Sequence, residues 1–352
     1  MSILDIPTNH NLTQQEWSNE MFKEHVEELY FMPFMGESMK APVIVKRELE
    51  KEAGDKLTLP KSYLLDQDSG VTGSVTLEGK EQDMNYGDQT LTAIEKRNAV
   101  RFRLGMSDQR TSINHAMNAR EILLDWKTQE TDNAMFDAMS TTPTANRELA
   151  ADSTATHSAS VPAAGIDDIA TTDICTVKGI RRLKLHAITG NANAAEKIKP
   201  FKDAEFGKQS FLLFLDPWSL QDLKADPDYV AYAKEEGKGR AAFFEGGITD
   251  IDGVTIIECD KIKREENAGS VFVARNLLVG AGACAVNWAG APLMNGQRGH
   301  IQWTEKDFDY GHQLGIAVGD IKGVIKIRFN RDNTGLQDDN AVIQFYTASV
   351  VS

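Results

Sequence analysis

The feature that most constrains this chain is a stretch without glycine or proline, bounded by Gly105 and Pro143. Because nothing in it interrupts helical hydrogen bonding, the stretch favours one long helix. Apolar residues recur in it at helical spacing among charged ones, which predicts a buried stripe. A helix of about 30 residues would be about 45 Å long. We interpret the stripe as core rather than as a cofactor site. Its members are Ile113, Ala116, Met117, Leu123, Leu124, Trp126, Met135, Phe136 and Met139.

The segment before this helix, residues 54–105, has the opposite character. Short β-prone pieces such as 57–59 and 75–77 alternate with glycines, which predicts a long hairpin-like excursion. Large apolar residues are sparse in it, and an isolated two-stranded ribbon is only marginally stable in water. The excursion therefore needs another surface to lie on. That surface belongs either to its own domain or to an adjacent subunit, and both alternatives remain open.

At the N-terminus, Thr13 and Glu16 have the spacing of a capping box and precede apolar residues at helical spacing, which predicts an amphipathic helix over residues 14–31. This helix packs either on its own subunit or, as an arm, on a neighbour. Nothing in the sequence chooses between the two.

Beyond the long helix, residues 140–173 are rich in Ser, Thr and Ala, a composition that we interpret as a domain junction. The remainder mixes helices and strands, which predicts an α+β or α/β lobe followed by closing strands. The expected helices cover residues 179–190 and 220–236. The expected strands cover 210–215, 251–258, 316–318, 323–329 and 342–346.

Composition excludes several classes of protein. The 352 residues contain no apolar run near the roughly 20 residues of a membrane span, and the N-terminus lacks the pattern of a signal peptide. A formal charge of −14 argues against a protein that grips nucleic acid, although not against one that encloses it. The three cysteines are far apart and predict buried free thiols rather than disulfides or a zinc site. These cysteines are Cys175, Cys259 and Cys284.

Two segments could carry chemistry. Gly280, Gly282 and Ala285 match G-x-G-x-x-A after an apolar run, but Gly290 and Pro292 interrupt the helix that a dinucleotide site requires. A second group could gather around a metal, although its spacing fits no established pattern and a polar turn explains it equally well. That group comprises His300, Asp307, Asp309 and His312. The sequence contains no catalytic motif of a known type, so we predict no catalytic, cofactor-binding or metal-ligating residue.

The order of these pieces resembles an architecture. A short arm, a glycine-punctuated β excursion, one long helix, a junction, a mixed lobe and late strands are similar to the parts of the tailed-phage capsid fold, the Hong Kong 97 fold. Sequence detail resembles the major capsid proteins of N-four-like and related podoviruses and siphoviruses. The residues that carry this likeness are Phe34-Met35-Gly36, 49–57, 70–73, 77–81, 97–102, the helix from Arg110, 251–254, 280–285, Asp309-Tyr310-Gly311 and Ile321-Lys322-Gly323.

The resemblance implies an α+β shell subunit rather than an enzyme. It would assemble into pentamers and hexamers of an icosahedral virion shell around double-stranded DNA, in the bacterial host cytoplasm, without a membrane or cofactor. Scaffolding, portal and decoration proteins are further partners that it implies. The alternatives are an encapsulin-type nanocompartment shell, or a metal- or nucleotide-dependent enzyme using residues 280–312. The expected parts are the N-arm (1–53), E-loop (54–105), spine helix (106–142), junction (143–175), A-domain (176–295) and P-domain closing strands (296–352).

Overall fold

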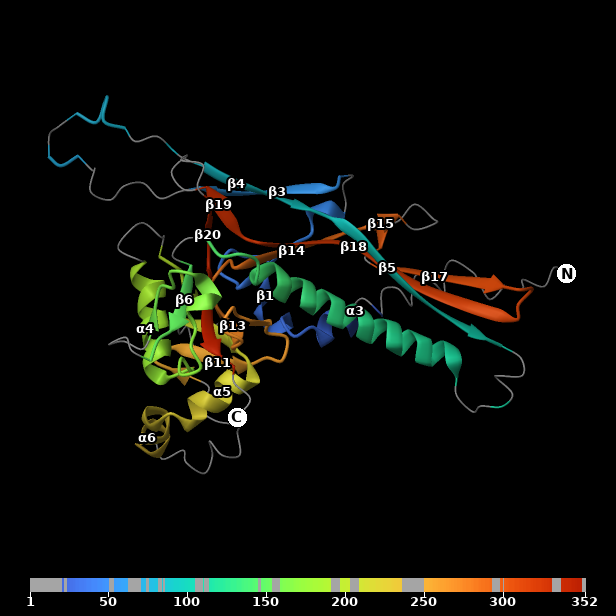
Figure 1. The fold of residues 1–352 in the computed structure, drawn as a ribbon. Helices are drawn as coiled ribbons and strands as arrows, with labels where there is room; N and C mark the ends of the chain where they lie inside the picture. The colour runs from blue at the N-terminus through green and yellow to red at the C-terminus, as the bar shows by residue number, and fades with distance from the viewer. Residues whose placement is uncertain are drawn as a thin grey trace.

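The structure is a computed structural model, and its described part includes four helices and strands in two main sheets (Figure 1). None of the described helices is long and apolar enough to cross a membrane. The described residues are 21, 24–50, 54–62, 71–73, 76–81, 84, 86–104, 110, 114–144, 147–153, 159–190, 197–202, 209–235, 250–292, 298–299, 301–330 and 337–349. The helices are α3 (His115–Met139), α4 (Val177–Thr189), α5 (Pro217–Ala225) and α6 (Pro227–Glu235), with short 3-10 turns η1 (Met32–Phe34), η2 (Glu48–Glu50) and η3 (Gly165–Asp168).

The predicted long helix is present as α3, with 25 residues and a length of about 37 Å at 1.5 Å per residue. It begins where the Asn114 side chain accepts hydrogen bonds from the backbone of Ala116 and Met117, a common N-cap. Its buried stripe includes Leu123 and Phe136. Met117, predicted for that stripe, is instead 57% exposed, because it lies in the first turn on the side away from the sheet.

A six-stranded sheet runs along α3 (Figure 1). Its central strand β18 pairs with β17 and β14 along one edge and with β5 along the other. The predicted strands 316–318 and 323–329 are therefore largely one 14-residue strand, since Gly319 and Gly323 continue the ladder instead of ending it. The sheet contains β1 (Met35–Gly36), β2 (Val43–Lys46), β5 (Ile94–Arg103), β14 (Cys284–Ala289), β17 (Ile301–Phe308) and β18 (Gln313–Lys326).

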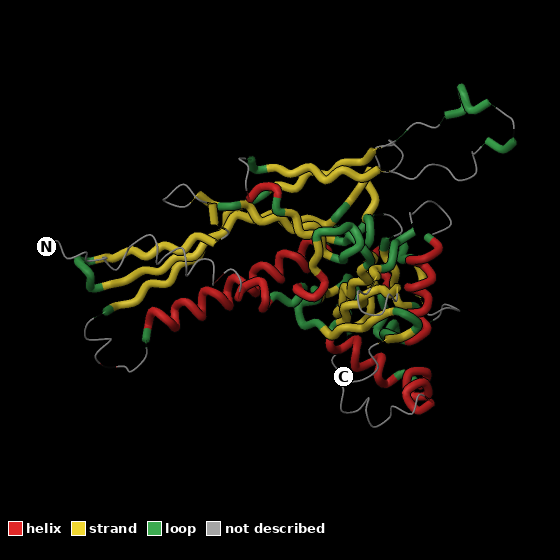
Figure 2. Tube along the Cα trace, turned by 180° about the vertical axis from the view of Figure 1, so that it is seen from behind, coloured by secondary structure: helices red, strands yellow, loops and turns green. Residues whose placement is uncertain are grey.

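A nine-stranded mixed sheet forms the second lobe, where α4, α5 and α6 lie close to it (Figure 2). The last strand, β21, pairs with β13 and β6 in this sheet, although β17 and β18, which come earlier in the chain, belong to the other. The strands are β6 (Glu148–Ala151), β7 (Ala159–Ser160), β8 (Phe201–Lys202), β9 (Gln209–Leu215), β10 (Asp250–Ile251), β11 (Val254–Glu258), β12 (Arg264–Glu266), β13 (Phe272–Val279) and β21 (Val342–Ala348).

Three pairs of strands stand apart from the two main sheets. They are β3 (Lys56–Ser62) with β4 (Tyr86–Thr92), β15 (Ala291–Pro292) with β16 (Arg298–Gly299), and β19 (Arg328–Asn330) with β20 (Gln337–Asp339).

An aromatic cluster ties the arm, the long helix and the second lobe together. The Phe31 ring lies 4.7 Å from that of Phe136 on α3 and 5.5 Å from that of Phe214 on β9. Tyr30 completes the contact by donating a hydrogen bond to the Glu258 carbonyl at 2.9 Å. Buried aromatic rings in edge or tilted contact stabilise a core beyond their area alone, so the last residues of the expected arm helix fix the body of the subunit.

Other sequence predictions have mixed outcomes. The helix at 179–190 and the strands at 210–215 and 251–258 are confirmed as α4, β9 and β10 with β11. The single helix over 220–236 is wrong: the chain forms α5 and α6, which separate at Asp226, whose ψ of 127° is extended because the next residue is Pro227. Of the helix expected at 14–31, residues 21 and 24–28 are helical and 29–31 are not, while 14–20, 22 and 23 lie outside the described residues.

Candidate assembly surfaces

The β3–β4 hairpin is anchored at its base and exposed beyond it. Leu57, Leu59 and Leu91 are buried in a small core under the six-stranded sheet, whereas further out Leu77 and Met84 are 60% and 64% exposed. Figures 1 and 2 place the described residues between the two strands, 71–73, 76–81 and 84, away from both main sheets. These apolar side chains project from the body of the subunit and are available for contact with another molecule.

At the other end of the molecule, β5, β18 and β17 form a long three-stranded extension with α3 packed on one face (Figure 1). Trp303, Ile316 and Val318 point to that face and bury against Leu123 and Leu124. Side chains alternate between the faces of a strand, so the other face takes the odd-numbered residues of β5 and the even-numbered residues of β17. That face is basic. Its cations are Arg97, Arg101, Arg103 and Lys306.

A ring and two glycines flatten this basic face. Arg101 lies 4.4 Å and Lys306 5.1 Å from the centroid of the Phe308 ring. A Cβ on Gly315 would come within 2.8 Å of Phe308, and one on Gly319 within 2.6 Å of the Arg97 side chain. The side chains of Phe308 and Arg97 therefore lie flat across Gly315 and Gly319, and a larger residue at either glycine would push them away from the sheet.

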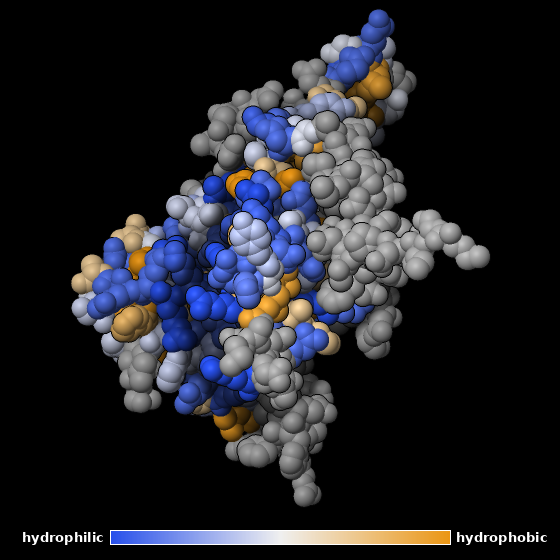
Figure 3. All heavy atoms as spheres, turned by 90° about the vertical axis from the view of Figure 1, so that its right-hand side faces the viewer, coloured by the Kyte–Doolittle hydropathy of each residue, from blue (hydrophilic) through white to orange (hydrophobic). Residues whose placement is uncertain are grey.

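The turn joining β17 to β18 holds Asp309, Tyr310 and Gly311 in left-handed conformations, with φ of 52°, 54° and 85°. The His312 N–H closes it by donating to the Asp309 carbonyl at 3.0 Å. The Tyr310 side chain is fully exposed. Figure 3 views this end of the molecule, where hydrophilic side chains cover most of the described surface and apolar ones form small separate patches.

Charged side chains are buried where α3 crosses β18. Lys127 is completely buried and forms ion pairs with Asp320 and with Glu130, the latter at 3.1 Å. Lys322 pairs with the same Glu130, and Lys96 on β5 reaches it from the edge at 2.7 Å. Each charge therefore has an opposite partner, which is the condition for tolerating charge in a low-dielectric interior.

Burial shifts the pKa values in this cluster. Burial raises the pKa of Asp320, although Lys127 and Lys322 oppose this shift. Burial also lowers the pKa of Lys322 to about 8, although Asp320 and Glu130 oppose it. Burial alone would raise the pKa of Glu130, but the surrounding lysines lower it to about 2. The pKa of His25, from the arm, is lowered to about 3 by burial and then by Lys322 and Lys127. The imidazole therefore stays neutral against α3.

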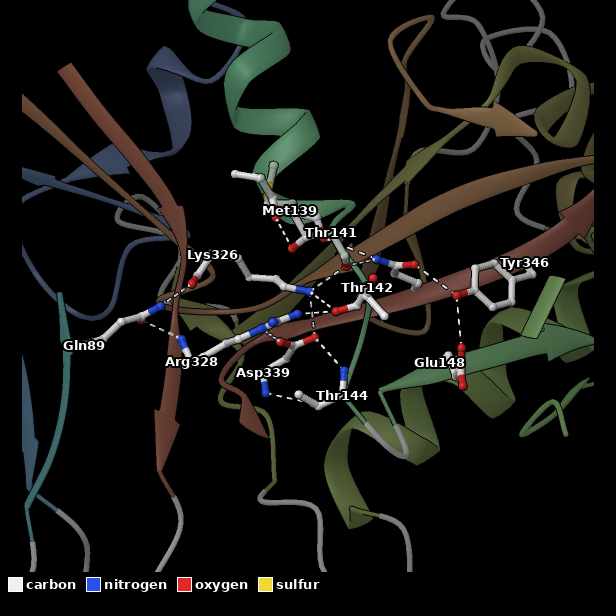
Figure 4. Close-up of polar contacts among 12 residues, drawn as sticks. Gln89, Met139, Thr141, Thr142, Thr144, Glu148, Lys326, Arg328, Asp339 and Tyr346 are labelled. Atoms are coloured by element: carbon white, nitrogen blue, oxygen red, sulfur yellow. Dashed lines mark hydrogen bonds and ion pairs between the residues drawn. The ribbon is translucent and has the colours of Figure 1, made fainter. Parts of the chain in front are cut away.

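A second polar cluster joins the hairpin, the end of α3 and both lobes (Figure 4). Asp339 accepts hydrogen bonds from Lys326 at 2.8 Å and from Arg328 at 2.6 Å. Lys326 also donates to the Thr141 carbonyl at 2.9 Å, just past the helix. Gln89 on β4 donates to the Lys326 carbonyl at 2.9 Å and accepts from the Arg328 N–H at 2.7 Å.

This second cluster fixes the direction of the hairpin. The Gln89 side chain bridges the Lys326 carbonyl and the Arg328 N–H, so β4 cannot rotate without breaking both hydrogen bonds. Burial lowers the pKa of Lys326 to about 8, although Asp339 opposes the shift. The hairpin, the helix end and the second lobe are thus held by one set of partly buried hydrogen bonds, which are costly to leave unpaired.

Comparison with known proteins identifies the family. A family model described as "Phage capsid protein" matches residues 5–351. The chain belongs to this family. It is also 28% identical to the major capsid protein of Pseudomonas phage KPP25, over 95% of this chain and 94% of that protein. The resemblance drawn from the sequence is confirmed.

Solved structures confirm the capsid fold. The capsid of Ralstonia phage GP4 has a TM-score of 0.74 at 24% identity and covers 99% of both chains. The capsid of cyanophage Pam1 also has a TM-score of 0.74, at 20% identity over the whole of both chains. The head of Helicobacter pylori bacteriophage KHP40 has a TM-score of 0.71 at 15% identity, over 91% of this chain and 92% of that one. The capsid-family chain therefore has the predicted α+β Hong Kong 97 fold.

The nucleotide interpretation of residues 280–285 is wrong. Gly280 follows β13, but the chain continues into strand β14 and not into the helix that would bind a pyrophosphate. The glycines serve packing: a Cβ on Gly280 would come within 2.7 Å of the Lys199 carbonyl, and Gly282 has a φ of +72°. This run carries the chain from one sheet to the other.

The metal alternative gains no support. Asp307 lies at the end of β17, Asp309 and His312 lie in the following turn, and His300 falls outside the described residues. Among the residues that the structure describes, no three His, Cys, Asp or Glu side chains lie close enough to hold a metal ion. His10 and His157 also fall outside the described residues, and His25, His115 and His186 join no such group within the described ranges.

The cysteines are buried free thiols, as predicted. Burial raises all three thiol pKa values, that of Cys259 to about 11 and that of Cys284 to about 12. Protonated, buried thiols are poor nucleophiles.

Sequence reasoning missed three features of these surfaces: the basic face, the buried ion pairs and the exposed tyrosine. The signal for the first was present, because cations recur at every second position in Arg101-Phe102-Arg103. The signal for the second was the pair Asp320 and Lys322, which alternate in phase with the buried Ile316 and Val318. Tyr310 had no signal beyond the Asp-Tyr-Gly turn.

Proposed function

We propose that this chain is the major capsid protein of a tailed phage, which self-assembles into an icosahedral shell enclosing a double-stranded DNA genome. Membership in the phage capsid family implies a structural rather than an enzymatic role. The observation that carries the proposal is the β3–β4 hairpin, which projects from the body with apolar side chains exposed. A segment of this kind completes its packing only on another molecule.

In this proposal the expected parts act as follows. The E-loop (54–105) lies over a neighbouring subunit, the spine helix (106–142) and the strands at 296–352 support it, and the A-domain (176–295) makes the contacts that close pentamers and hexamers. The arm (1–53) and the junction (143–175) connect them. Strands β13 and β14 belong to 176–295, and they pair with β21 and β18, which belong to 296–352. Each main sheet therefore contains strands from both of these parts, so the two lobes would move as one piece.

Further partners follow from the same proposal. Scaffolding, portal and decoration proteins would bind the assembling shell in the host cytoplasm, and the finished shell would enclose DNA without reading its sequence. An encapsulin-type shell remains the alternative of the same architecture, and it would enclose a protein cargo. The DNA content of particles isolated from the natural source separates the two.

The test is negative-stain electron microscopy and size-exclusion chromatography of the purified full-length protein. Rings, tubes or closed particles are expected. In a matched variant, residues 63–85 are replaced by Asn-Gly, a turn that can join paired strands, because Ser62 and Tyr86 already face each other. This variant should fold but stay monomeric. A Val161→Ser variant in the junction, also at an exposed apolar residue, serves as the control and should assemble. A wild-type protein that stays monomeric under all conditions would contradict the proposal.

A further inference from the structure

Three of the four cations on the basic face of β5 and β17 have no ion-pair partner among the described residues. Among the described residues no carboxylate pairs with Arg101, Arg103 or Lys306, and Arg97 contacts Glu95, at 3.4 Å, on the surface. The buried carboxylates of the same sheet lie on the opposite face, against α3. Four cations therefore gather on one flat surface of a chain whose formal charge is −14, an arrangement that attracts an anionic partner.

The chain itself carries a matching anionic segment at the end of the hairpin. Residues 63–85 contain five carboxylates and one lysine. In their described part, Glu78 and Glu81 are exposed. The turn between them is ordered by hydrogen bonds: Gly79, at a φ of +83°, donates its N–H to Glu81 at 2.7 Å, and Lys80 donates to the Leu77 carbonyl at 3.0 Å.

These two surfaces cannot meet within one copy. Figures 1 and 2 place the end of the hairpin and the β5–β18–β17 extension at opposite ends of the molecule, and Gln89 fixes the direction of the hairpin. A contact between them must therefore join two copies. Because it uses two different patches, it is heterologous, and heterologous contacts repeated by rotation close into rings.

We infer that the acidic turn at residues 76–81 of one copy docks on the basic face formed by Arg97, Arg101, Arg103 and Lys306 of the next. This inference rests on the proposed function and specifies the surface that the hairpin binds. The contact is electrostatic and exposed, so it steers subunits together and weakens as salt rises.

The test reverses the charges on each side. The face variant Arg101→Glu/Arg103→Glu and the turn variant Glu78→Lys/Glu81→Lys should each raise the critical concentration for assembly about tenfold or more, because each juxtaposes like charges. Combining all four substitutions restores complementarity and should return assembly to near the wild-type level. Mixing the two defective variants in equal amounts should restore six-membered rings and sheets, because each can then alternate with the other, whereas a five-membered ring cannot alternate. Light scattering and negative-stain microscopy measure the loss of assembly in each variant and its recovery in the combined and mixed samples.

The controls separate this inference from the proposed function. If wild-type protein assembles and the reversals leave assembly unchanged, the inference is wrong and the capsid function stands; if wild-type protein never assembles, the function itself fails. Circular dichroism establishes that each variant is folded. The other partner that could bind this basic face is packaged nucleic acid. If short duplex DNA binds the wild-type monomer, loses affinity in the face variant, and assembly is unaffected in that variant, the face binds nucleic acid and the inference is overturned.

Discussion

Replacing Lys127 by Met should destabilise the unassembled subunit by about 3 kcal/mol. Lys127 is completely buried between Asp320 and Glu130, and removing one partner of a buried ion pair costs about 3–5 kcal/mol because the other charge stays buried. Met preserves most of the side-chain volume, so the cavity contribution is small. Lys322 still lies 3.9 Å from Asp320, which places the loss at the lower end of that range.

A double-mutant cycle identifies the cause of this loss. Asp320→Leu alone should cost a similar amount, because it leaves Lys127 with only Glu130. The double variant Lys127→Met/Asp320→Leu should lie within about 1 kcal/mol of the parent, since a packed apolar pair often replaces a buried ion pair without loss. Glu130 keeps Lys322 and Lys96 in either case.

The assay is equilibrium urea denaturation followed by circular dichroism and by tryptophan fluorescence, since Trp303 lies in the core beside this cluster. The monomeric variant in which Asn-Gly replaces residues 63–85 is the host, because assembly would add stability by mass action. A cost below about 1 kcal/mol for Lys127→Met would refute the reasoning. So would a double variant that loses the sum of both single losses, because the two residues would then act independently.

The remaining predictions use the same host. Between pH 6.5 and about 3 the His25 imidazole binds a proton in the unfolded chain but not in the folded one. The free energy of unfolding should therefore decrease by about 1.4 kcal/mol for each unit by which the pH is lowered. A His25→Gln variant should lack this contribution to the pH dependence. Gly323→Ala should cost about 1–3 kcal/mol, because its Cβ would lie 2.7 Å from the Thr92 carbonyl oxygen; an unchanged urea midpoint would contradict this. Asp339→Asn should lower the free energy of unfolding by about 3 kcal/mol, because it leaves Lys326 buried without its counter-charge. A loss of only a few tenths of a kcal/mol would show that the backbone carbonyls alone stabilise the Lys326 ammonium.

The sequence predicted local elements well where their signals lie close together along the chain. Helix α3 follows from the absence of breakers and from Asn114 at its start, and β9 from an apolar run that ends at Asp216. The error at 220–236 was avoidable, because Pro227 restricts the residue before it.

Long-range arrangement was beyond local signals. Nothing near Cys284 or Val342 specifies that β14 and β21 join different sheets, because strand order depends on partners more than 30 residues away. The two assembly surfaces divide in the same way. The excursion was predictable from its sparse apolar content, whereas the basic face required knowledge of which side of β5 packs on α3.

The unbroken length of β18 has a mechanical consequence. Its 14 residues extend about 48 Å at 3.4 Å per residue, from the Tyr310 turn to the hydrogen bonds around Lys326 that hold the other lobe. With α3 running alongside, the extension acts as a stiff lever whose fulcrum lies at that cluster. A rotation of about 5° there displaces the far end by about 4 Å. In the proposed shell, small angular adjustments at a few buried hydrogen bonds would set the local curvature and let one sequence occupy rings of different tilt.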